Sequence, residues 1–259
     1  MQGNLTDRPW FIRMVAALST VLMCSFVAPS FAAPPPDDAW HLNTTFGIWA
    51  MSLDGKVGVG NVESDVNVDF GDLIDKTAFS LNPGVEVQKG DWVFSFIGNY
   101  SKLEDDKTFD DGRGGDIDMW MGVFDFSVGY TVLRTEVGGM PLTLTPAVGA
   151  QITYMKLELN PNLGETADKS KTWVDPYVGG RVVLGLTKEL DWRTGALIGG
   201  FGVGSDLTWS VGTYLDWHFA ESWALSVGYR ATSWDYDQDD FKWDMTMHGP
   251  WISITHRWF

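Results

Sequence analysis

The sequence predicts an all-β fold, an antiparallel up-and-down transmembrane β-barrel of ten strands, with eight strands as the alternative. Three observations lead to this prediction. Apolar and polar residues alternate with a period of two along most of the chain. Most of the alternating segments are longer than the strands of a soluble sheet and suit strands tilted across a bilayer. The connections between them alternate between short and long, as in membrane barrels.

The first 32 residues have the pattern of a secretory signal peptide. Two arginines precede an apolar run, Met14–Val27, which is too short to span a bilayer. Ser30 and Ala32 then supply the small residues at the −3 and −1 positions of a signal-peptidase cut before Ala33. The sequence therefore predicts a signal peptide at 1–32 and a single outer-membrane barrel domain at 33–259.

The composition excludes several classes of protein. The chain has 34 acidic and 18 basic residues and a net charge of −16, which argues against nucleic acid as a partner because phosphate binding needs a basic patch. The single cysteine, Cys24, lies inside the predicted signal, so the rest of the chain is held by its fold alone. The 14 tryptophans, 15 phenylalanines and 29 glycines are unusual for a soluble acidic protein and typical of a barrel in lipid.

Ten segments alternate in this way and are the expected strands. In order they are 40–53, 77–88, 92–103, 117–132, 141–157, 172–187, 192–203, 207–219, 223–235 and 246–258. We expect the long acidic connections to face outward and the short turns to face the periplasm. The long connections are 54–76, 104–116, 158–171 and 236–245, and the short turns are "QKGD", "LRTEVGGM", "TKELD" and "AES". Alternatively, the first long connection extends the first two strands above the membrane, because Val66, Val68 and Phe70 also alternate.

Tryptophans recur beside the short turns. In "DDAW", "KGDW", "KELDW" and "AESW" a tryptophan follows an acidic residue at the start of a strand. Amphipathic rings at the lipid–water boundary form such a girdle in membrane barrels. The predicted girdle consists of Trp40, Trp92, Trp192, Trp217, Trp223 and Trp258. On the last strand Ile252 and Ile254 share the parity of Trp258, which leaves Phe259 as an extra terminal residue.

Seven charged residues have the parity of the barrel interior. They are Glu86, Asp125, Asp175, Arg181, Arg193, Asp216 and Arg230. Inside a narrow barrel such charges are expected to form ion pairs, because an isolated charge away from water is costly. Arg193 and Asp216 lie near the periplasmic ends of adjacent strands and are the best candidate pair. A barrel of this size is expected to be largely filled by side chains, and a narrow ion path is the alternative.

The segment "GGFGVGSDLTW" (199–209) resembles a phosphate-binding loop only superficially. A phosphate loop leads into a helix, whereas this segment leads into another alternating strand. We therefore expect a tight β-hairpin at the outer rim, with an opening beside it because the loop is short.

No constellation in the sequence indicates catalytic residues, a cofactor or a specific metal site. A serine hydrolase needs a histidine placed to activate a serine, and no histidine has such a partner along its strand. His248 is the nearest candidate because it lies near the outer end of the last strand. The carboxylates of Asp235, Asp237 and Asp239 have the spacing of a calcium loop, but Asp240 stands where the loop needs glycine. Looser binding of divalent cations between the acidic loops and lipopolysaccharide is the expectation.

Together these features resemble a small bacterial outer-membrane β-barrel protein of the OmpA/OmpW-like kind. The segments "WVDPYVGGR" (Trp173–Arg181), 199–209 and "MHGPWISI" (Met247–Ile254) are similar to outer-membrane barrels of no known activity. The resemblance implies a Gram-negative outer-membrane location, contact with outer-membrane lipid and lipopolysaccharide, and insertion by the barrel-assembly machinery through the C-terminal strand. It implies no activity.

The function that we expect from the sequence is a non-enzymatic outer-membrane barrel with an interior largely plugged by ion pairs and a structural or surface-interaction role. A narrow, porin-like channel for small solutes is the alternative. A lipid- or peptide-processing barrel enzyme is the second alternative. An outer-membrane protease of the omptin type also has ten strands with paired acidic residues and a histidine above the membrane. The segment 235–244 with His248 offers such groups, but carboxylates occur in every loop.

Overall fold

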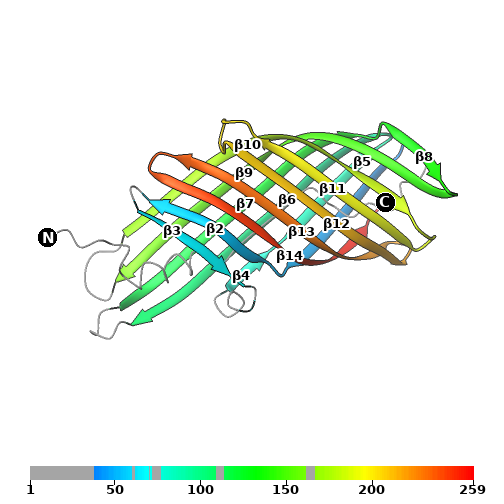
Figure 1. Ribbon diagram of the computed structural model, residues 1–259. Helices are drawn as coiled ribbons and strands as arrows, with labels where there is room; N and C mark the ends of the chain where they lie inside the picture. The colour runs from blue at the N-terminus through cyan, green and yellow to red at the C-terminus, as the bar shows by residue number, and fades with distance from the viewer. Residues whose placement is uncertain (1–37, 60–61, 70, 72–76, 109–113, 162–166) are drawn as a thin grey trace.

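The computed structural model describes residues 38–59, 62–69, 71, 77–108, 114–161 and 167–259. The signal peptide predicted for the first 32 residues lies outside these ranges. Among the described residues there is no helix long and apolar enough to cross a membrane. They form one antiparallel β-sheet that closes on itself (Figure 1).

Fourteen strands make up this sheet in the described part of the chain. They are β1 (Trp40–Trp49), β2 (Ser52–Val59), β3 (Val62–Val68), β4 (Thr77–Leu81), β5 (Pro83–Lys89), β6 (Trp92–Thr108), β7 (Gly114–Tyr130), β8 (Leu133–Val137), β9 (Met140–Pro161), β10 (Ala167–Gly185), β11 (Leu190–Gly200), β12 (Leu207–Ala220), β13 (Trp223–Gln238) and β14 (Phe241–Arg257). Hydrogen-bonded neighbours follow the order β1, β5, β6, β7, β9, β10, β11, β12, β13 and β14, and β14 returns to β1.

These strands fill ten positions around the wall, because the remaining strands are continuations or additions. β2 continues the wall above β1 and pairs with the outer half of β14. β3 folds back on β2, β4 pairs with the outer part of β6, and β8 pairs with β9. The predicted fold, a closed antiparallel ten-stranded barrel, is therefore confirmed. The C-terminus lies beside the start of β1, where Leu42 and Phe259 share a backbone hydrogen bond, and this end of the barrel is called the periplasmic end below.

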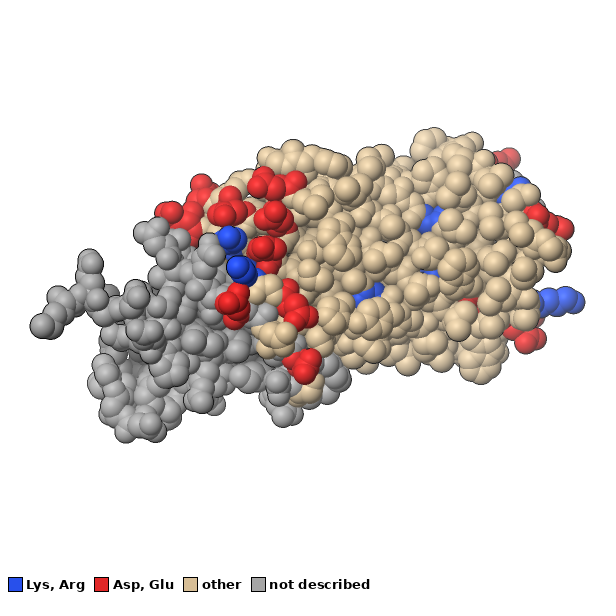
Figure 2. Space-filling model, viewed as in Figure 1, with Lys and Arg blue, Asp and Glu red and all other residues tan. Residues whose placement is uncertain are grey.

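Side chains alternate between the lumen and the outer surface. On β14 Trp251 and Ser253 are 8% and 3% exposed, whereas Ile252 and Ile254 are 46% and 41% exposed, which is the parity expected from the sequence. On the face that Figure 2 shows, the middle of the outer surface carries almost no charge. A closed sheet pairs its backbone groups internally, so with an apolar outer surface it can cross a bilayer.

The long connections expected at the outer end are mostly strand. β6 and β7 remain paired up to Thr108↔Gly114, and β13 and β14 up to Gln238↔Phe241. Only Asp239 and Asp240 form the last of these turns, both with positive φ, 52° and 59°. The expected loop boundaries are wrong, because the acidic residues of these segments occupy strand positions above the membrane. The alternative for the first connection is confirmed, since β2 and β3 pair as a hairpin there.

The segment "LRTEVGGM" is not a short turn as expected. It forms a β-hairpin in which β8 pairs with the start of β9, and Gly138 and Gly139 turn the chain with φ of 62° and 80°. Arg134 of β8 binds Asp91 of the neighbouring turn, with Nε 3.1 Å and Nη2 2.9 Å from Oδ1. The alternation of Leu133, Thr135 and Val137 was the signal for this strand.

The glycine-rich segment forms the expected outer hairpin between β11 and β12. Gly200, Phe201 and Gly202 have positive φ of 85°, 52° and 73°. The tip of the loop is exposed, but the loop folds inward at Gly204 and Ser205, and the expected opening beside it stays a prediction. Ser205 is fully buried, and its backbone N–H and hydroxyl both donate hydrogen bonds to Asp175.

Candidate functional site

The barrel lumen has a charged layer toward the periplasmic end. The Arg181 Nη1 atom of β10 lies 2.5 Å from Glu86 Oε2 of β5, across the barrel. Arg193 of β11 and Asp216 of β12 are diagonal neighbours joined by two hydrogen bonds, Nε to Oδ2 at 2.5 Å and Nη2 to Oδ1 at 2.8 Å. All four side chains are buried. Because their charges are paired, they can be held inside the wall, where an isolated charge would be costly.

Asp125 and Arg230 lie in the same part of the lumen with aromatic partners. The Tyr177 hydroxyl donates a hydrogen bond to Asp125 Oδ1. The guanidinium carbon of Arg230 lies 4.6 Å from the ring centre of Trp49 and 5.9 Å from that of Trp251. Aromatic faces stabilise a cation in this position. These aromatic contacts could not be predicted from the sequence, because they join strands far apart in the chain.

Asp175 departs from the expectation of an ion pair. Its carboxylate accepts hydrogen bonds from Ser205 and from Trp173 Nε1, the latter at 3.1 Å, and it forms no salt bridge with another described residue. The reason is its height, since Asp175 lies near the middle of β10 and Arg181 lies six residues nearer the periplasmic end. Hydroxyl, amide and indole donors replace a guanidinium there.

An apolar layer fills the lumen toward the outer end. Its members come from five strands and are two tryptophans, four methionines and one leucine, none of which was predicted as a site residue. They are Leu53, Met121, Met155, Trp234, Trp243, Met245 and Met247. Most are fully buried, and Trp234 Nε1 donates to Gln151 Oε1 at 2.7 Å. Methionine fills irregular spaces of this kind.

Aromatic side chains add to this layer near the outer mouth. The rings of Trp173 and Tyr236 stack with centres 4.3 Å apart, and Phe241 lies 6.4 Å and 6.0 Å from them. Trp173 and Tyr236 are buried. A solute entering from outside would therefore meet stacked aromatic rings before it reached the charges.

A cavity of about 10 Å³ lies beside Arg181, between β6, β7 and β9, which is room for about one water molecule. Within the described chain, buried Glu86 Oε1, Asp125 Oδ2 and Arg193 Nη1 have no hydrogen-bond partner in the protein. Buried polar groups of this kind are expected to bind individual waters, which is different from a continuous water path.

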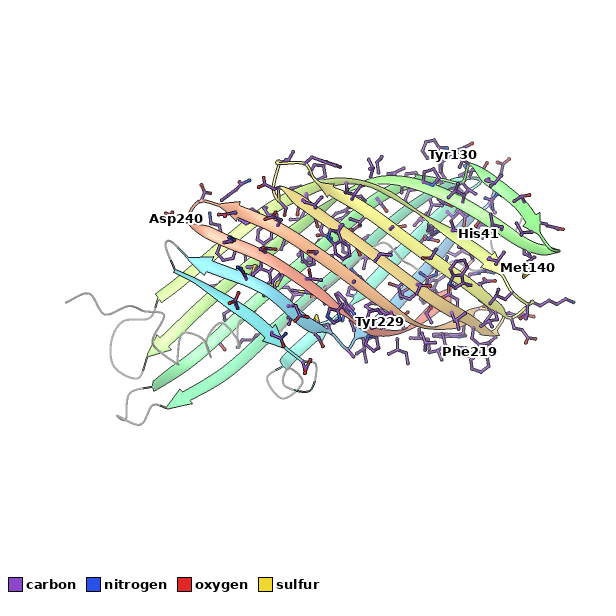
Figure 3. The ribbon with its side chains drawn as sticks, viewed as in Figure 1. His41, Tyr130, Met140, Phe219, Tyr229 and Asp240 are labelled. Atoms are coloured by element: carbon purple, nitrogen blue, oxygen red, sulfur yellow. The ribbon has the colours of Figure 1, made fainter. Side chains whose placement is uncertain are left out.

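The tryptophans of the expected girdle lie on the outer surface. Trp40, Trp92, Trp192, Trp217, Trp223 and Trp258 are between 38% and 59% exposed. Tyr130 and Phe219 point outward at the same end of the barrel (Figure 3). Trp92 contacts Tyr130 edge to face at 5.0 Å. Amphipathic rings exposed at this level suit the boundary between lipid and periplasm.

His248 forms a hydrogen-bonded chain on the outer surface of the wall. Its Nδ1 lies 2.7 Å from the Tyr229 hydroxyl and its Nε2 lies 3.0 Å from Asp54 Oδ2. Asp54 also accepts a hydrogen bond from Asn67 at 2.6 Å. The sequence singled out His248 but not its partners, because Asp54 is 194 residues away. The hydroxyl that reaches the histidine belongs to a tyrosine, whereas enzymes of this class activate serine or cysteine with histidine.

Acidic residues gather at the outer end of β13 and β14. Asp235, Asp237, Asp239, Asp240 and Asp244 are exposed there, and Figure 2 shows a band of acidic residues across this region. Among the described residues, no group of three or more histidine, cysteine or acidic side chains is arranged to hold a metal ion. The calcium spacing of the sequence therefore does not become a coordination site in the described structure.

A closed ten-stranded barrel with an apolar outer surface is an outer-membrane β-barrel. No family model and no curated protein matches the chain. Among solved structures, the outer membrane protease OmpT from Escherichia coli is similar, with 9% identity and a TM-score of 0.54, over 84% of this chain and 97% of that chain. At this identity the likeness shows the fold alone.

Two other outer-membrane barrels also match. The translocator domain of the autotransporter NalP from Neisseria meningitidis has 13% identity and a TM-score of 0.46, over 84% of this chain and 88% of that chain. Neisserial surface protein A has 12% identity and a TM-score of 0.33, over 84% and 96%. The fold and the apolar outer surface assign the protein to the outer membrane. The narrower OmpA/OmpW-like resemblance stays a prediction.

Proposed function

We propose that this protein is a non-enzymatic outer-membrane barrel that is closed to solutes and presents an acidic outer end to the cell surroundings. The observation that carries the proposal is the filling of the lumen in two layers. The Glu86–Arg181 and Arg193–Asp216 pairs occupy the periplasmic half, and the tryptophan and methionine layer occupies the outer half. Ten strands enclose a space that side chains can fill, so the barrel supports an envelope or surface role better than transport.

Conductance in a planar bilayer tests this proposal. Purified full-length protein is expected to give no discrete current steps. Because the two layers lie in series, Trp234→Ala with Trp243→Ala, or Glu86→Ala with Arg181→Ala, should each leave the barrel closed. The four substitutions together should produce steps. Trp217→Ala on the outer surface is the matched control and should change nothing. Clear steps from the unaltered protein would favour the narrow channel instead.

A second candidate, a lipid-processing enzyme, rests on the Tyr229–His248–Asp54 chain. The chain lies on the lipid-facing side of the wall, and a carboxylate that orients a histidine beside a hydroxyl is the arrangement of a general base. Incubation of the protein with phospholipid micelles tests this candidate. Fatty-acid release that is lost with His248→Ala would support the enzyme, and no release would support the non-enzymatic barrel.

A further inference from the structure

The outer surface of β6, β7 and β9 changes chemistry in rows. Direct cross-strand neighbours place Phe96, Phe126 and Ala150 in one row and Gly98, Phe124 and Ile152 in the next row outward. Then come Tyr100, Gly122 and Tyr154, followed by Lys102, Trp120 and Lys156. The surface therefore passes from apolar to tyrosine to lysine and tryptophan along three adjacent strands.

The lysine row lies at the height of the outer lipid headgroups. Lys102 follows Trp92, at the periplasmic girdle, by ten residues on β6. At roughly 3.3 Å per residue and a tilt of about 40°, this separation corresponds to roughly 25 Å along the barrel axis, the height of the apolar band of such barrels. Tyr100, one row below and 37% exposed, marks the upper edge of that band.

Two ammonium groups converge on one indole in this row. Lys102 Nζ lies 4.9 Å and Lys156 Nζ 5.0 Å from the ring centre of Trp120. Asp118 Oδ1 lies 3.2 Å from Lys102 Nζ and fixes it from the next row outward. The ring face attracts both cations, so the two positive charges are held close together although they repel each other.

A pair of cations at this height suits one kind of partner. The outer surface below them is apolar, so acyl chains cover it, and the group reached next along a lipid is its headgroup. Lysine binds phosphate as a point charge, and basic groups at the boundary attract anionic lipid. On a chain with a net charge of −16, this placement matches a negatively charged lipid.

We propose that Lys102, Trp120 and Lys156 bind the phosphate-bearing headgroup of a lipid in the outer leaflet. The two ammonium groups flank the phosphate, the indole holds them in place, and the apolar rows below contact the acyl chains. The inference rests on the membrane location of the barrel and is independent of whether the lumen conducts.

Native mass spectrometry of the detergent-solubilised full-length protein tests the proposal. The probes are a bisphosphorylated lipid A and the same lipid after removal of its phosphates. Lys102→Gln with Lys156→Gln is expected to weaken binding of the phosphorylated lipid roughly tenfold. Binding of the dephosphorylated lipid should not change. Lys102→Arg with Lys156→Arg should keep the binding.

The matched control is at the other end of the barrel. Lys89 Nζ lies 5.0 Å from the ring centre of Trp40, so Lys89→Gln with Lys188→Gln removes the same charge and a contact of the same kind near the periplasm. This variant should bind the phosphorylated lipid as the unaltered protein does. Equal loss in both variants, or no loss in the first, would overturn the proposal. Displacement of the lipid by millimolar inorganic phosphate would show a site for free phosphate instead, and would overturn it too.

Discussion

Gly149 of β9 lies directly under the ring of Tyr177 of β10. A Cβ atom at Gly149 would come within 2.3 Å of both Cζ and the hydroxyl oxygen of that ring. The same ring carries the hydroxyl that donates to Asp125. A large aromatic side chain can therefore lie flat against the wall of a narrow lumen only because the facing residue has no side chain.

Gly149→Ala is expected to destabilise the barrel by about 1–3 kcal/mol, because the tyrosine ring must move in a filled interior. Unfolding by urea in detergent micelles, followed by the mobility of unboiled protein on a gel, measures this. Gly71→Ala, with no atom within 4 Å of the added carbon, is the control and should be close to neutral. In a Tyr177→Ala background the penalty should fall but not vanish, because an added Cβ would also lie 2.4 Å from the Phe126 carbonyl oxygen. An unchanged penalty would mean that the contact with the ring is not its cause.

Removing one partner of the Arg193–Asp216 pair should destabilise the barrel by about 3 kcal/mol or more. Asp216→Asn leaves a buried guanidinium without its counter-charge, and this is costly in a low-dielectric site. The same urea titration measures the loss. Asp91→Asn breaks the half-exposed pair with Arg134 and should cost less than about 1 kcal/mol. Equal losses in the two variants would mean that burial does not set the cost.

The fold could be predicted from the sequence because the alternation with a period of two is a local property. The alternation shows which side chains point into the lumen and which point outward. It therefore predicts that Glu86, Arg193 and Asp216 face the lumen. The strand ends at the outer side could not be predicted in this way. Acidic residues in strands above the membrane face water on the outer surface, so their composition resembles that of a loop.

Most contacts of the candidate site could not be predicted, because they join strands across the barrel. Arg181 reaches Glu86 over 95 residues of sequence, and His248 reaches Asp54 over 194. The methionines of the outer layer had the right parity but carry no charge that would single them out. Asp175 shows what alternation cannot predict. Alternation indicates whether a side chain faces the lumen, but not whether an oppositely charged partner lies at the same height along the barrel axis.

In the β11–β12 turn, the cost of backbone strain at positive φ can be measured separately from the cost of a steric clash. Gly200 and Gly202 both have positive φ, but an added Cβ would lie 2.5 Å from Ser205 O at Gly200 and meets nothing within 4 Å at Gly202. Gly202→Ala should therefore cost only the backbone strain, about 1 kcal/mol. Gly200→Ala should cost more, because it also displaces the buried Ser205. Urea midpoints of the two variants provide the comparison, and equal values would show that the inward fold of the loop contributes nothing.

Because its outer end is acidic, the folded barrel is expected to become more stable as the pH falls. Burial, and then repulsion from Asp244 and Asp206, raises the pKa of the Asp235 carboxyl, at the water-exposed end of β13, above its usual value of 3.8. Lys242 opposes this shift. The folded barrel thus binds this proton more tightly than the unfolded chain. The resulting stability is present below pH 3.8 and is lost as the pH rises through the raised pKa.

Asp235→Asn should therefore raise the urea midpoint at pH 7, and the gain should disappear at a pH below 3.8, where the aspartate is protonated in both states. The gain should be small and should shrink in high salt, because Asp235 is exposed. Asp239→Asn is the control in the same hairpin. Asp239 Oδ2 lies 2.9 Å from Lys171 Nζ, so its ionised form is paired and its removal should give no gain at pH 7. An equal gain from both variants would mean that the total charge of the outer end, and not the surroundings of Asp235, sets the pH dependence.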